Sequence, residues 1–416
     1  MIKLLILADD FTGGLDTGVQ FASRGIPTCV LTRTGEDYES AAEDCEVLVV
    51  VAETRHLSAE EAYRTVYAVI RKAAELGVPH IYKKTDSALR GNIGAELTAV
   101  MEACGASLLP FIPALPAMDR VTRKGVHYVD GMPVAESVFG RDPFEPVRES
   151  NVARLIALQS TMPVVSIRPE ELEESLGIAV VDAETEEDLR RAGQALSEVE
   201  GWRVSAGCAG FASVLPELLH LYRGEIPTLP KLDPGLFILC GSVNPITQRQ
   251  LDFGERNGFI RIHIPPEQKL NPEGFGSAEG EAVLAGWRQK MEETPWMILD
   301  ANDPEPDNHE TAEFADHLGM AIEEVRARIS ESMGTIFRAL MQSEAGRTLL
   351  ITGGDTLLQG MNRMNVYRMN PLMEVFPGIV LSRVKLYGRD RFVITKSGGF
   401  GEESLLSDLK NLISLQ

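Results

Sequence analysis

The feature that most restricts the fold is a regular alternation of apolar and amphipathic segments over the first hundred residues. Ser58 followed by Glu61 forms a capping box at the start of one helix, and Gly77 supplies its stop. This order predicts a mostly parallel sheet with helices on both faces. Strands are expected at residues 2–8, 27–32, 46–51 and 79–83, and helices at residues 15–23 and 58–76.

A second series of the same kind follows residues 223–234, which contain three prolines and one glycine. Such a segment is typical of a domain boundary, so we expect two domains, 1–228 and 229–416. The predicted class is therefore a two-domain α/β protein with mostly parallel or mixed sheets flanked by helices. In the second domain, strands are expected at residues 236–240, 259–264, 296–300, 348–352, 378–384 and 391–395.

Residues 116–150 interrupt the first series with a long stretch rich in glycine, proline and charge and poor in periodicity. A loop of this length within a compact domain is usually functional or disordered. Its charged residues, among them Asp119, Arg120 and Arg123, favour a segment that lines a site over a plain linker.

The formal net charge of −21 argues against nucleic acid or an anionic membrane as the main partner. A site for an anion must therefore supply its own positive charge. Five scattered cysteines without a C-x-x-C motif are typical of a reduced, cytoplasmic protein. The apolar start at residues 1–8 ends too early for a signal peptide, and no apolar run reaches the length of a membrane span.

A charged cluster lies where the strand at residues 79–83 gives way to a helix for which Asn92 is the expected N-cap. Ligands of open α/β sheets bind at the carboxyl ends of strands. Lys84 and Arg90 are suited to hold a carboxylate or phosphate, and Asp86 to accept a proton from a hydroxyl. The alternative is a solvated loop with an ion pair.

A pair of carboxylates, Asp9 and Asp10, follows the first strand, with Thr12 close behind. These groups are suited to hydrogen-bond a polyhydroxylated substrate. Two adjacent aspartates cannot both be buried and ionised without partners, because like charges raise a pKa. Service as a helix N-cap explains one of the two equally well, but not both.

Glycine turns follow three strands of the second domain, and backbone N–H groups in such turns can hold phosphate oxygens. Asp355 is suited to bind Mg²⁺ directly or through water. Neither G-x-x-x-x-G-K-[ST] nor G-x-G-x-x-G occurs at a strand–helix junction, which disfavours a P-loop and a dinucleotide fold. The residues of these turns are Gly241-Ser242, Gly353-Gly354-Asp355-Thr356 and Ser397-Gly398-Gly399-Phe400-Gly401.

One domain thus suits a small hydroxylated anion, and the other suits phosphate. Phosphoryl transfer needs two such sites, positive charge around the transferred group and a carboxylate that orients the acceptor hydroxyl. The residues alone therefore favour a small-molecule kinase.

The sequence resembles the four-carbon acid sugar kinase family, which includes threonate, erythronate and 3-oxo-tetronate kinases. The resemblance spans almost the whole chain. The matching segments are Ala8-Asp9-Asp10-Phe11-Thr12-Gly13 with Asp16, Lys84-Thr85-Asp86-Ser87 with Arg90-Gly91-Asn92, Asp142-Pro143 with Pro146-Val147, Gly241-Ser242 with Thr247 and Gln250, Gly353-Gly354-Asp355-Thr356, and Thr395-Lys396-Ser397-Gly398-Gly399-Phe400-Gly401.

The resemblance implies an N-terminal domain that binds the sugar acid, a C-terminal domain that binds ATP, and an active site in the cleft between them. It also implies γ-phosphoryl transfer from ATP to the terminal (4-) hydroxyl of the acid. Asp86, and after it Asp10, is the expected base. A homo-oligomer is compatible with this interpretation. The residues carried over are Asp9, Asp10, Lys84, Asp86 and Arg90 for the acid, and Ser242, Gly353, Gly354, Asp355, Thr356, Gly398 and Gly399 for the nucleotide.

The chain departs from the family pattern at Asp119, Asn244 and Leu357, so the identity of the acid stays open. One alternative is a kinase of another small hydroxy acid or sugar on the same scaffold, which Asp119 motivates. Another is a non-catalytic protein that senses a sugar acid or nucleotide. A dehydrogenase is disfavoured because the dinucleotide motif is missing.

Overall fold

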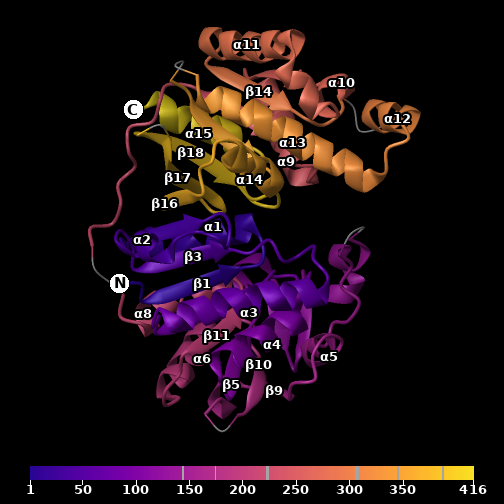
Figure 1. Cartoon of the computed structure of the whole chain (residues 1–416). Coiled ribbons are helices and arrows are strands. Elements are labelled where there is room, and N and C mark those ends of the chain that lie inside the picture. Colours follow the sequence, from indigo (N-terminus) through magenta and orange to yellow (C-terminus); the bar gives the residue numbers. More distant parts are fainter. Residues whose placement is uncertain (143–144, 174, 222–223, 305–308, 344–345, 387) are drawn as a thin grey trace. The chain divides into compact units, whose positions relative to one another are not determined.

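The computed structural model describes residues 1–142, 145–173, 175–221, 224–304, 309–343, 346–386 and 388–416. These residues form two compact units, Met1–Pro227 and Thr228–Gln416, each built on a sheet flanked by helices (Figure 1). The α/β class with mostly parallel sheets is confirmed. Arg223, at the start of the expected boundary segment, lies outside the described residues.

The first unit's sheet has the strand order β2-β3-β1-β4-β11-β5-β10-β9, and its neighbouring strands pair in parallel. The strands are β1 (Leu4–Ala8), β2 (Thr28–Leu31), β3 (Val47–Val51), β4 (His80–Lys84), β5 (Leu108–Ile112), β9 (Val164–Ile167), β10 (Gly177–Val181) and β11 (Val204–Gly207). The helices are α1 (Phe11–Ala22), α2 (Tyr38–Ala42), α3 (Ala59–Glu75), α4 (Ile93–Cys104), α5 (Val152–Ala157), α6 (Glu186–Glu198), α7 (Ala209–Ala212) and α8 (Leu215–Leu218).

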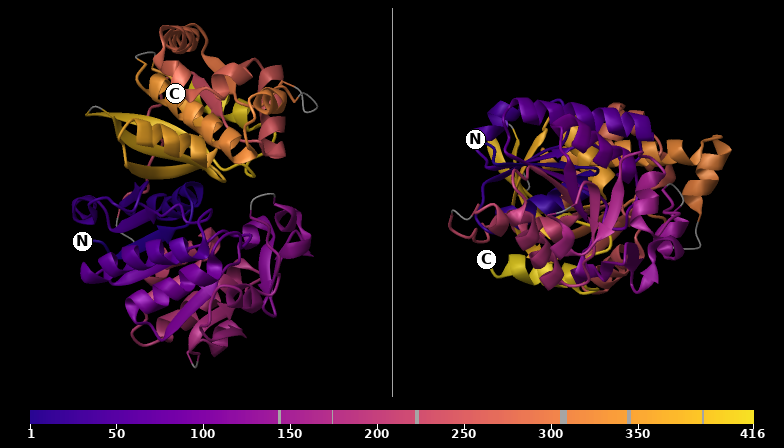
Figure 2. Two further views of the ribbon diagram at one scale, coloured as in Figure 1. Left: turned by 45° about the vertical axis from the view of Figure 1, so that its right-hand side comes forward. Right: turned by 90° about the horizontal axis from the view of Figure 1, so that it is seen from below.

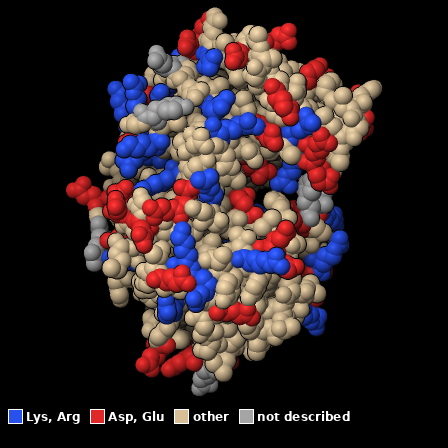
Figure 3. All heavy atoms as spheres, in the orientation of Figure 1, with Lys and Arg blue, Asp and Glu red and all other residues tan. Residues whose placement is uncertain are grey.

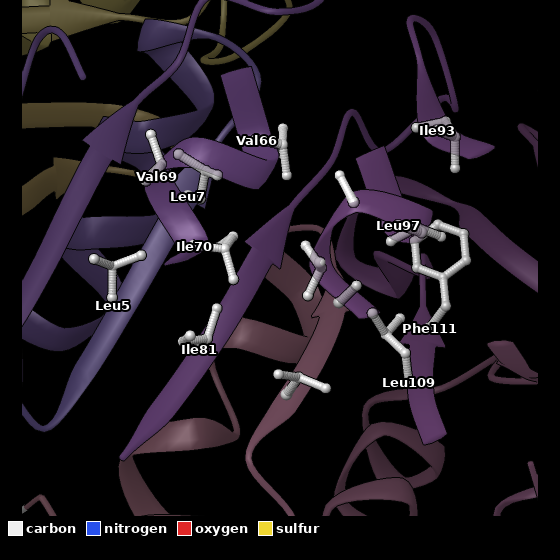
Figure 4. Close-up of a cluster of buried hydrophobic side chains, with 14 of the residues drawn as sticks. Leu5, Leu7, Val66, Val69, Ile70, Ile81, Ile93, Leu97, Leu109 and Phe111 are labelled. Atoms are coloured by element: carbon white, nitrogen blue, oxygen red, sulfur yellow. The ribbon is translucent and has the colours of Figure 1, made fainter. Parts of the chain in front are cut away.

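Every residue of β1 and β3 is buried, as in strands covered on both faces. Figure 4 shows how one face is filled: Leu5 and Leu7 of β1 lie near Val69 and Ile70 of α3. Farther along the same core, Leu97 of α4 lies beside Leu109 and Phe111 of β5 (Figure 4). This core fixes the carboxyl ends of the strands, from which the loops of interest emerge.

Two local expectations need correction. The first helix begins at Phe11 rather than residue 15, because the Asp10 side chain accepts from the Gly13 N–H and caps it. Asn92 occupies the N-cap position of α4 but makes no side-chain cap. Its amide instead donates to the carbonyls of Thr54 and Leu57, which joins the loops that follow β3 and β4.

The long segment at residues 116–150, expected as an irregular loop, contains a small antiparallel sheet. Its strands are β6 (Arg120–Arg123), β7 (Val126–Val129) and β8 (Met132–Pro133). Two-residue turns join them, Lys124-Gly125 and Asp130-Gly131, and all four of these residues have positive φ. That geometry is typical of type I′ hairpins, for which Asp-Gly is a strong sequence signal. We call residues 116–142 the hairpin segment.

The hairpin segment is fastened to the loop after β4 by His127, which is fully buried. Its Nε2 lies 2.9 Å from the Ser87 carbonyl oxygen, and its Nδ1 lies 3.0 Å from the Thr122 hydroxyl. A neutral ring satisfies both contacts if Nε2–H donates to the carbonyl and Nδ1 accepts from the hydroxyl. Burial lowers the pKa of His127 to about 4, and the charge of Arg120 acts in the same direction.

The second unit's sheet has the order β13-β14-β12-β15-β18-β17-β16, parallel through β18 and antiparallel from there on. The antiparallel strands β16, β17 and β18 are yellow in Figure 2. The strands are β12 (Leu236–Cys240), β13 (Ile260–His263), β14 (Trp296–Asp300), β15 (Thr348–Thr352), β16 (Arg368–Phe376), β17 (Ile379–Leu386) and β18 (Arg389–Lys396). The helices are α9 (Pro245–Arg256), α10 (Pro266–Lys269), α11 (Ala278–Glu293), α12 (Glu310–His317), α13 (Ile322–Met341), α14 (Gly354–Arg363) and α15 (Leu405–Ser414).

Helices α13 and α14 approach each other closely at glycines. A Cβ added at Gly360 would lie 1.8 Å from Cδ1 of Phe337, and one at Gly334 would lie 2.7 Å from Cβ of Gln359. Phe337 is fully buried, so its ring has no room to retreat. This contact holds α14, whose first turn carries the expected nucleotide residues.

No helix within the described ranges is long and apolar enough to cross a membrane. The cysteines are unpaired thiols, and all but the half-buried Cys104 are buried. Acidic and basic side chains are interspersed over the face shown in Figure 3.

Replacement of glycine by alanine should have opposite effects on stability at the α13–α14 contact and at a helix position without close neighbours. Gly360→Ala should lower the free energy of unfolding by about 1–3 kcal/mol, because the new methyl group overlaps a buried ring. Gly286→Ala in α11 meets nothing within 4 Å and should raise it by about 0.5–1 kcal/mol, because alanine favours a helix. Urea denaturation of both variants tests this, and a Gly360→Ala protein as stable as the wild type would contradict it.

The buried His127 predicts a pH-dependent stability. The ring is neutral in the folded state with a pKa of about 4, whereas in the unfolded state its pKa is about 6.5. Between pH 6.5 and pH 4, the His127 ring binds a proton in the unfolded state but not in the folded state. The free energy of unfolding therefore falls by about 3 kcal/mol as the pH is lowered from 6.5 to 4. Urea denaturation from pH 7 to 4.5 should show the advantage of the wild type over His127→Gln shrinking across this window. An advantage independent of pH would contradict the assignment.

Candidate functional site

In each unit, the connections that follow two adjacent parallel strands diverge toward opposite edges of the sheet. In the first unit, α1 leads from β1 toward β2, while α4 leads from β4 toward β5 on the other side. In the second unit, α9 leads from β12 toward β13, while α14 leads from β15 toward the opposite edge. Ligands of open α/β sheets bind at such switch points. The residues singled out in the sequence lie in these loops.

The first unit's switch point is organised by Arg55, from the loop after β3. Its Nε and Nη2 donate to Oδ2 of Asp9 at 2.9 and 2.8 Å, and Nη1 donates to Oδ2 of Asp10 at 3.0 Å. Nη2 also lies 2.7 Å from Oδ1 of Asp10 and 3.7 Å from Oδ1 of Asp86. One guanidinium thus joins the aspartates of two loops.

Asp9 and Asp10 differ in exposure. The Asp9 carboxylate is buried, and although burial opposes ionisation, the charges of Arg55 and Lys84 hold its pKa below the ordinary value. The side chain of Asp10 is 22% exposed and caps α1. Asp10 is therefore the carboxylate of this pair that a ligand can reach.

Asp86 is buried and saturated with donors. Nε and Nη2 of Arg90 reach its two oxygens at 2.9 and 3.0 Å, and the backbone N–H groups of Ala88 and Arg90 donate to Oδ2 at 3.2 Å. Burial alone would raise the pKa of Asp86, but Arg55 and Arg90 hold it well below its ordinary value. Such a carboxylate is well placed to orient Arg90 and poorly placed to take a proton.

Lys84 ends β4 with a buried ammonium group. Within the described part of the chain, its Nζ has no hydrogen-bond acceptor, and its nearest carboxylate oxygen is Oδ1 of Asp9 at 3.9 Å. A Cβ on Gly13 would lie 2.5 Å from this Nζ, which places the ammonium beside the first turn of α1. The ammonium is therefore available to an anionic or hydroxylated ligand at the start of α1.

The neighbouring Lys83 points into the core instead. Its Nζ lies 2.8 Å from Oε2 of Glu96 in α4, and neither side chain is exposed to solvent. Burial raises the pKa of Glu96, against the opposing charge of Lys83. This pair lies beneath the switch point and does not compete for a ligand.

The glycine turns of the second unit lie close to one another. A Cβ on Gly241 would lie 2.2 Å from Oγ1 of Thr356, and one on Gly398 would lie 3.2 Å from Oγ of Ser242. Gly353 has a φ of +112° and precedes α14, whose N-terminus has no side-chain cap. The N–H groups of that first turn therefore lack a side-chain acceptor, as at helix N-termini that bind phosphate.

Lys396 supports the turn after β18 from below. Its buried Nζ donates to Oγ1 of Thr247 at 2.9 Å and to the carbonyls of Ser397 and Gly398 at 3.1 Å. Burial lowers the pKa of Lys396 to about 8. The Thr247 hydroxyl in turn donates to the Gly398 carbonyl at 3.0 Å, which ties this turn to α9.

Asp355 is placed differently from the other nucleotide-side residues. Its half-exposed carboxylate pairs with Nη2 of Arg326 from α13 at 2.9 Å. Among the described residues, no group of three or more His, Cys, Asp or Glu side chains is arranged to hold a metal ion. Of the family departures, Asn244 caps α9 through Ile246, and Leu357 is buried within α14.

Several residues in or beside these loops have no role predicted from the sequence. Arg55 follows β3 and Asn302 follows β14, so both could have been found as polar residues just beyond a strand end. Asn302 donates from Nδ2 to the Ser242 carbonyl at 3.1 Å. Asp142, from the resembling segments, lies 3.5 Å from Nη1 of Arg90, whereas its neighbour Pro143 lies outside the described residues.

Comparison with known proteins gives the same division of the chain. A family model described as a sugar-binding N-terminal domain matches residues 4–215. A second, described as a nucleotide-binding C-terminal domain, matches residues 237–406.

Relatives align along most of their length. The D-threonate kinase of Salmonella typhimurium is 32% identical, with 98% of this chain and 97% of that protein covered. The D-erythronate kinase of Heliobacterium modesticaldum is 28% identical (85% and 84% covered). The 3-oxo-tetronate kinase of Pseudomonas fluorescens is 25% identical (96% and 95% covered).

Solved structures share the fold. A protein from Salmonella typhimurium LT2 superposes with a TM-score of 0.80 at 23% identity, covering 99% of this chain and all of that one. A Haemophilus influenzae protein superposes with a TM-score of 0.71 at 20% identity, covering 98% of this chain and all of that one. With both family models matched and a relative above 30% identity along nearly the whole chain, this chain belongs to the four-carbon acid sugar kinase family.

Proposed function

We propose that this kinase transfers the γ-phosphoryl group of ATP to the terminal 4-hydroxyl of a four-carbon sugar acid such as threonate, erythronate or 3-oxo-tetronate. The observation that carries the proposal is the contrast between the two switch points. One is lined by arginine, lysine and aspartate, and the other is built from glycine turns and an uncapped helix N-terminus. The names of the relatives support the substrate class.

The proposal divides the work between the domains. Residues 1–228 would bind the sugar acid through Asp10, Lys84 and Arg90. Residues 229–416 would bind ATP, with phosphate oxygens on the backbone of Gly353–Thr356 and Gly398–Gly399 and beside Ser242. The placement of the reaction between the two domains stays a prediction.

Asp10 is the better candidate for the base that orients the acceptor hydroxyl. The oxygens of Asp86 already accept hydrogen bonds from Arg90 and from two backbone N–H groups, one or more of which a base would have to give up. The pKa of Asp86 also lies well below the ordinary value. Asp10 also accepts from Arg55 and from the Gly13 N–H, but its side chain is 22% exposed and it lies beside Gly13, as does the ammonium of Lys84. We therefore assign proton acceptance to Asp10 and the orientation of Arg90 to Asp86.

Mg²⁺ fits the proposal in the manner usual for nucleotide phosphates, with few protein carboxylates and several waters. Asp355, at the start of α14, is the residue that would hold the ion or its water, after exchanging its contact with Arg326. When bound, the ion would neutralise charge on the phosphates.

A panel of stereoisomeric four-carbon acids with ATP tests the reaction, read by ADP release and by 31P NMR of the product. The wild type should phosphorylate at least one acid at its terminal hydroxyl. Asp10→Asn should lower kcat about 10²–10⁴-fold, because asparagine keeps the helix cap but accepts no proton. The KM for ATP should change little.

The matched control is Asp130→Asn, at an exposed turn residue whose positive φ asparagine tolerates. It should turn over like the wild type. No ADP release with any four-carbon acid would contradict the proposed function. Full turnover by Asp10→Asn, together with a folded but inactive Asp86→Asn, would return the role of the base to Asp86.

A further inference from the structure

The first unit brings together several cationic side chains. They differ in how many of their N–H groups already donate hydrogen bonds to the protein. Arg55 is engaged by Asp9 and Asp10, and Arg90 by Asp86. Lys84 has no acceptor in the described structure, and its position beside Gly13 places it at the start of α1. A cation for the other end of a substrate must therefore come from elsewhere.

Arg120, in the hairpin segment, meets this need. Its Nη1 donates to the Ser87 hydroxyl, a neutral acceptor in the loop after β4. Its Nε is buried and has no hydrogen-bond partner, and no carboxylate lies within ion-pair distance of it in the described part of the chain. A buried guanidinium N–H without an acceptor is costly unless a ligand supplies one.

The surroundings of Arg120 fix its position. Its backbone pairs with Leu115, just beyond the end of β5, through hydrogen bonds of 2.7 and 3.2 Å. Its guanidinium lies 5.1 Å from the centre of the Phe139 ring, and that of Arg90 lies 5.2 Å from the same ring. The Phe139 ring thus lies near both arginines. Arg90 pairs with Asp86, whereas Arg120 forms no ion pair within the described residues, although its charge helps to lower the pKa of Asp86.

The two available cations come from different strand ends. Lys84 ends β4, and Arg120 is anchored beyond the end of β5, with β11 between these strands in the sheet. The backbones of β4 and β5 are therefore about 10 Å apart, at two strand spacings. A substrate that contacts both cations must do so with two different groups.

We propose that Arg120 binds the carboxylate of the sugar acid, and that the hairpin segment thereby selects acids over neutral sugars. This inference rests on the proposed function and assigns the polarity of the substrate. The carboxylate lies toward Arg120 and Phe139, and the terminal hydroxyl lies toward Lys84 and Asp10. The planar guanidinium offers the two parallel donors that a carboxylate accepts.

The test compares binding of the acid with binding of ATP and of an uncharged analogue of the acid. Arg120→Met should raise the KM for the acid about 100-fold, as expected when a partly buried partner of a charge is removed, and leave the KM for ATP within about threefold. The KM of Arg120→Lys for the acid should lie between those of the wild type and Arg120→Met. Lysine keeps the positive charge but lacks the two parallel N–H donors of a guanidinium. The inhibition constant of the corresponding four-carbon polyol, competing with the acid, should change at least tenfold less than the KM for the acid.

The control is Arg123→Met, on the same strand, whose side chain pairs with Glu184 at the surface. It should match the wild type in both KM values. An Arg120→Met enzyme with an unchanged KM for the acid would overturn the inference. Equal weakening of acid, polyol and ATP would also overturn it, since that would mean a structural role. These outcomes are distinct from failure of the proposed function, in which the wild type itself phosphorylates no four-carbon acid.

Discussion

The first unit's site depends on one buried guanidinium. Arg55 binds Asp9 and Asp10 and lies near Asp86, and the backbone N–H groups of Thr54 and Arg55 donate to the Asp9 carbonyl at 3.0 and 3.4 Å. The loops after β1, β3 and β4 thereby form one charged cluster. Removing one partner of such a buried pair typically costs about 3–5 kcal/mol, so the aspartates hold their positions with or without a ligand. Because Arg55 is fully engaged, the remaining cations are the ones that can serve a substrate.

Topology places both candidate sites, and side-chain chemistry distinguishes them. Each unit repeats the same arrangement, in which connections diverge from two adjacent parallel strands, and ligands of open α/β sheets bind at the carboxyl ends of such strands. The first unit carries charged side chains there, held in place by carboxylates, with the buried Lys83–Glu96 pair below. The second unit leaves backbone donors at Gly353 and the start of α14, with Lys396 supporting the neighbouring turn. Charged side chains suit a small acid, and bare backbone donors suit phosphates.

Much of the fold was predictable because buried parallel strands and amphipathic helices leave strong periodic patterns. The capping box predicted for Ser58 and Glu61 is confirmed, because the two residues lie only three positions apart in the sequence. The hairpins were missed because their strands are short, although Asp130-Gly131 is a recognisable turn. Arg55 and the role of Arg120 depend on contacts between segments tens of residues apart, such as Arg120 with Ser87. The proposal that Asp86 positions Arg90 and does not act as the base likewise depends on the contacts between these two side chains.

Hydrogen–deuterium exchange of the wild-type protein with one ligand at a time tests the central claim that the two switch points hold two different ligands. A four-carbon acid alone should slow exchange at residues 9–14, 85–92 and 116–123 and leave the second unit's turns unchanged. A non-hydrolysable ATP analogue alone should slow exchange at residues 241–246, 353–357 and 397–401. Protection by the acid confined to the second unit, or by the nucleotide analogue confined to the first, would contradict the account.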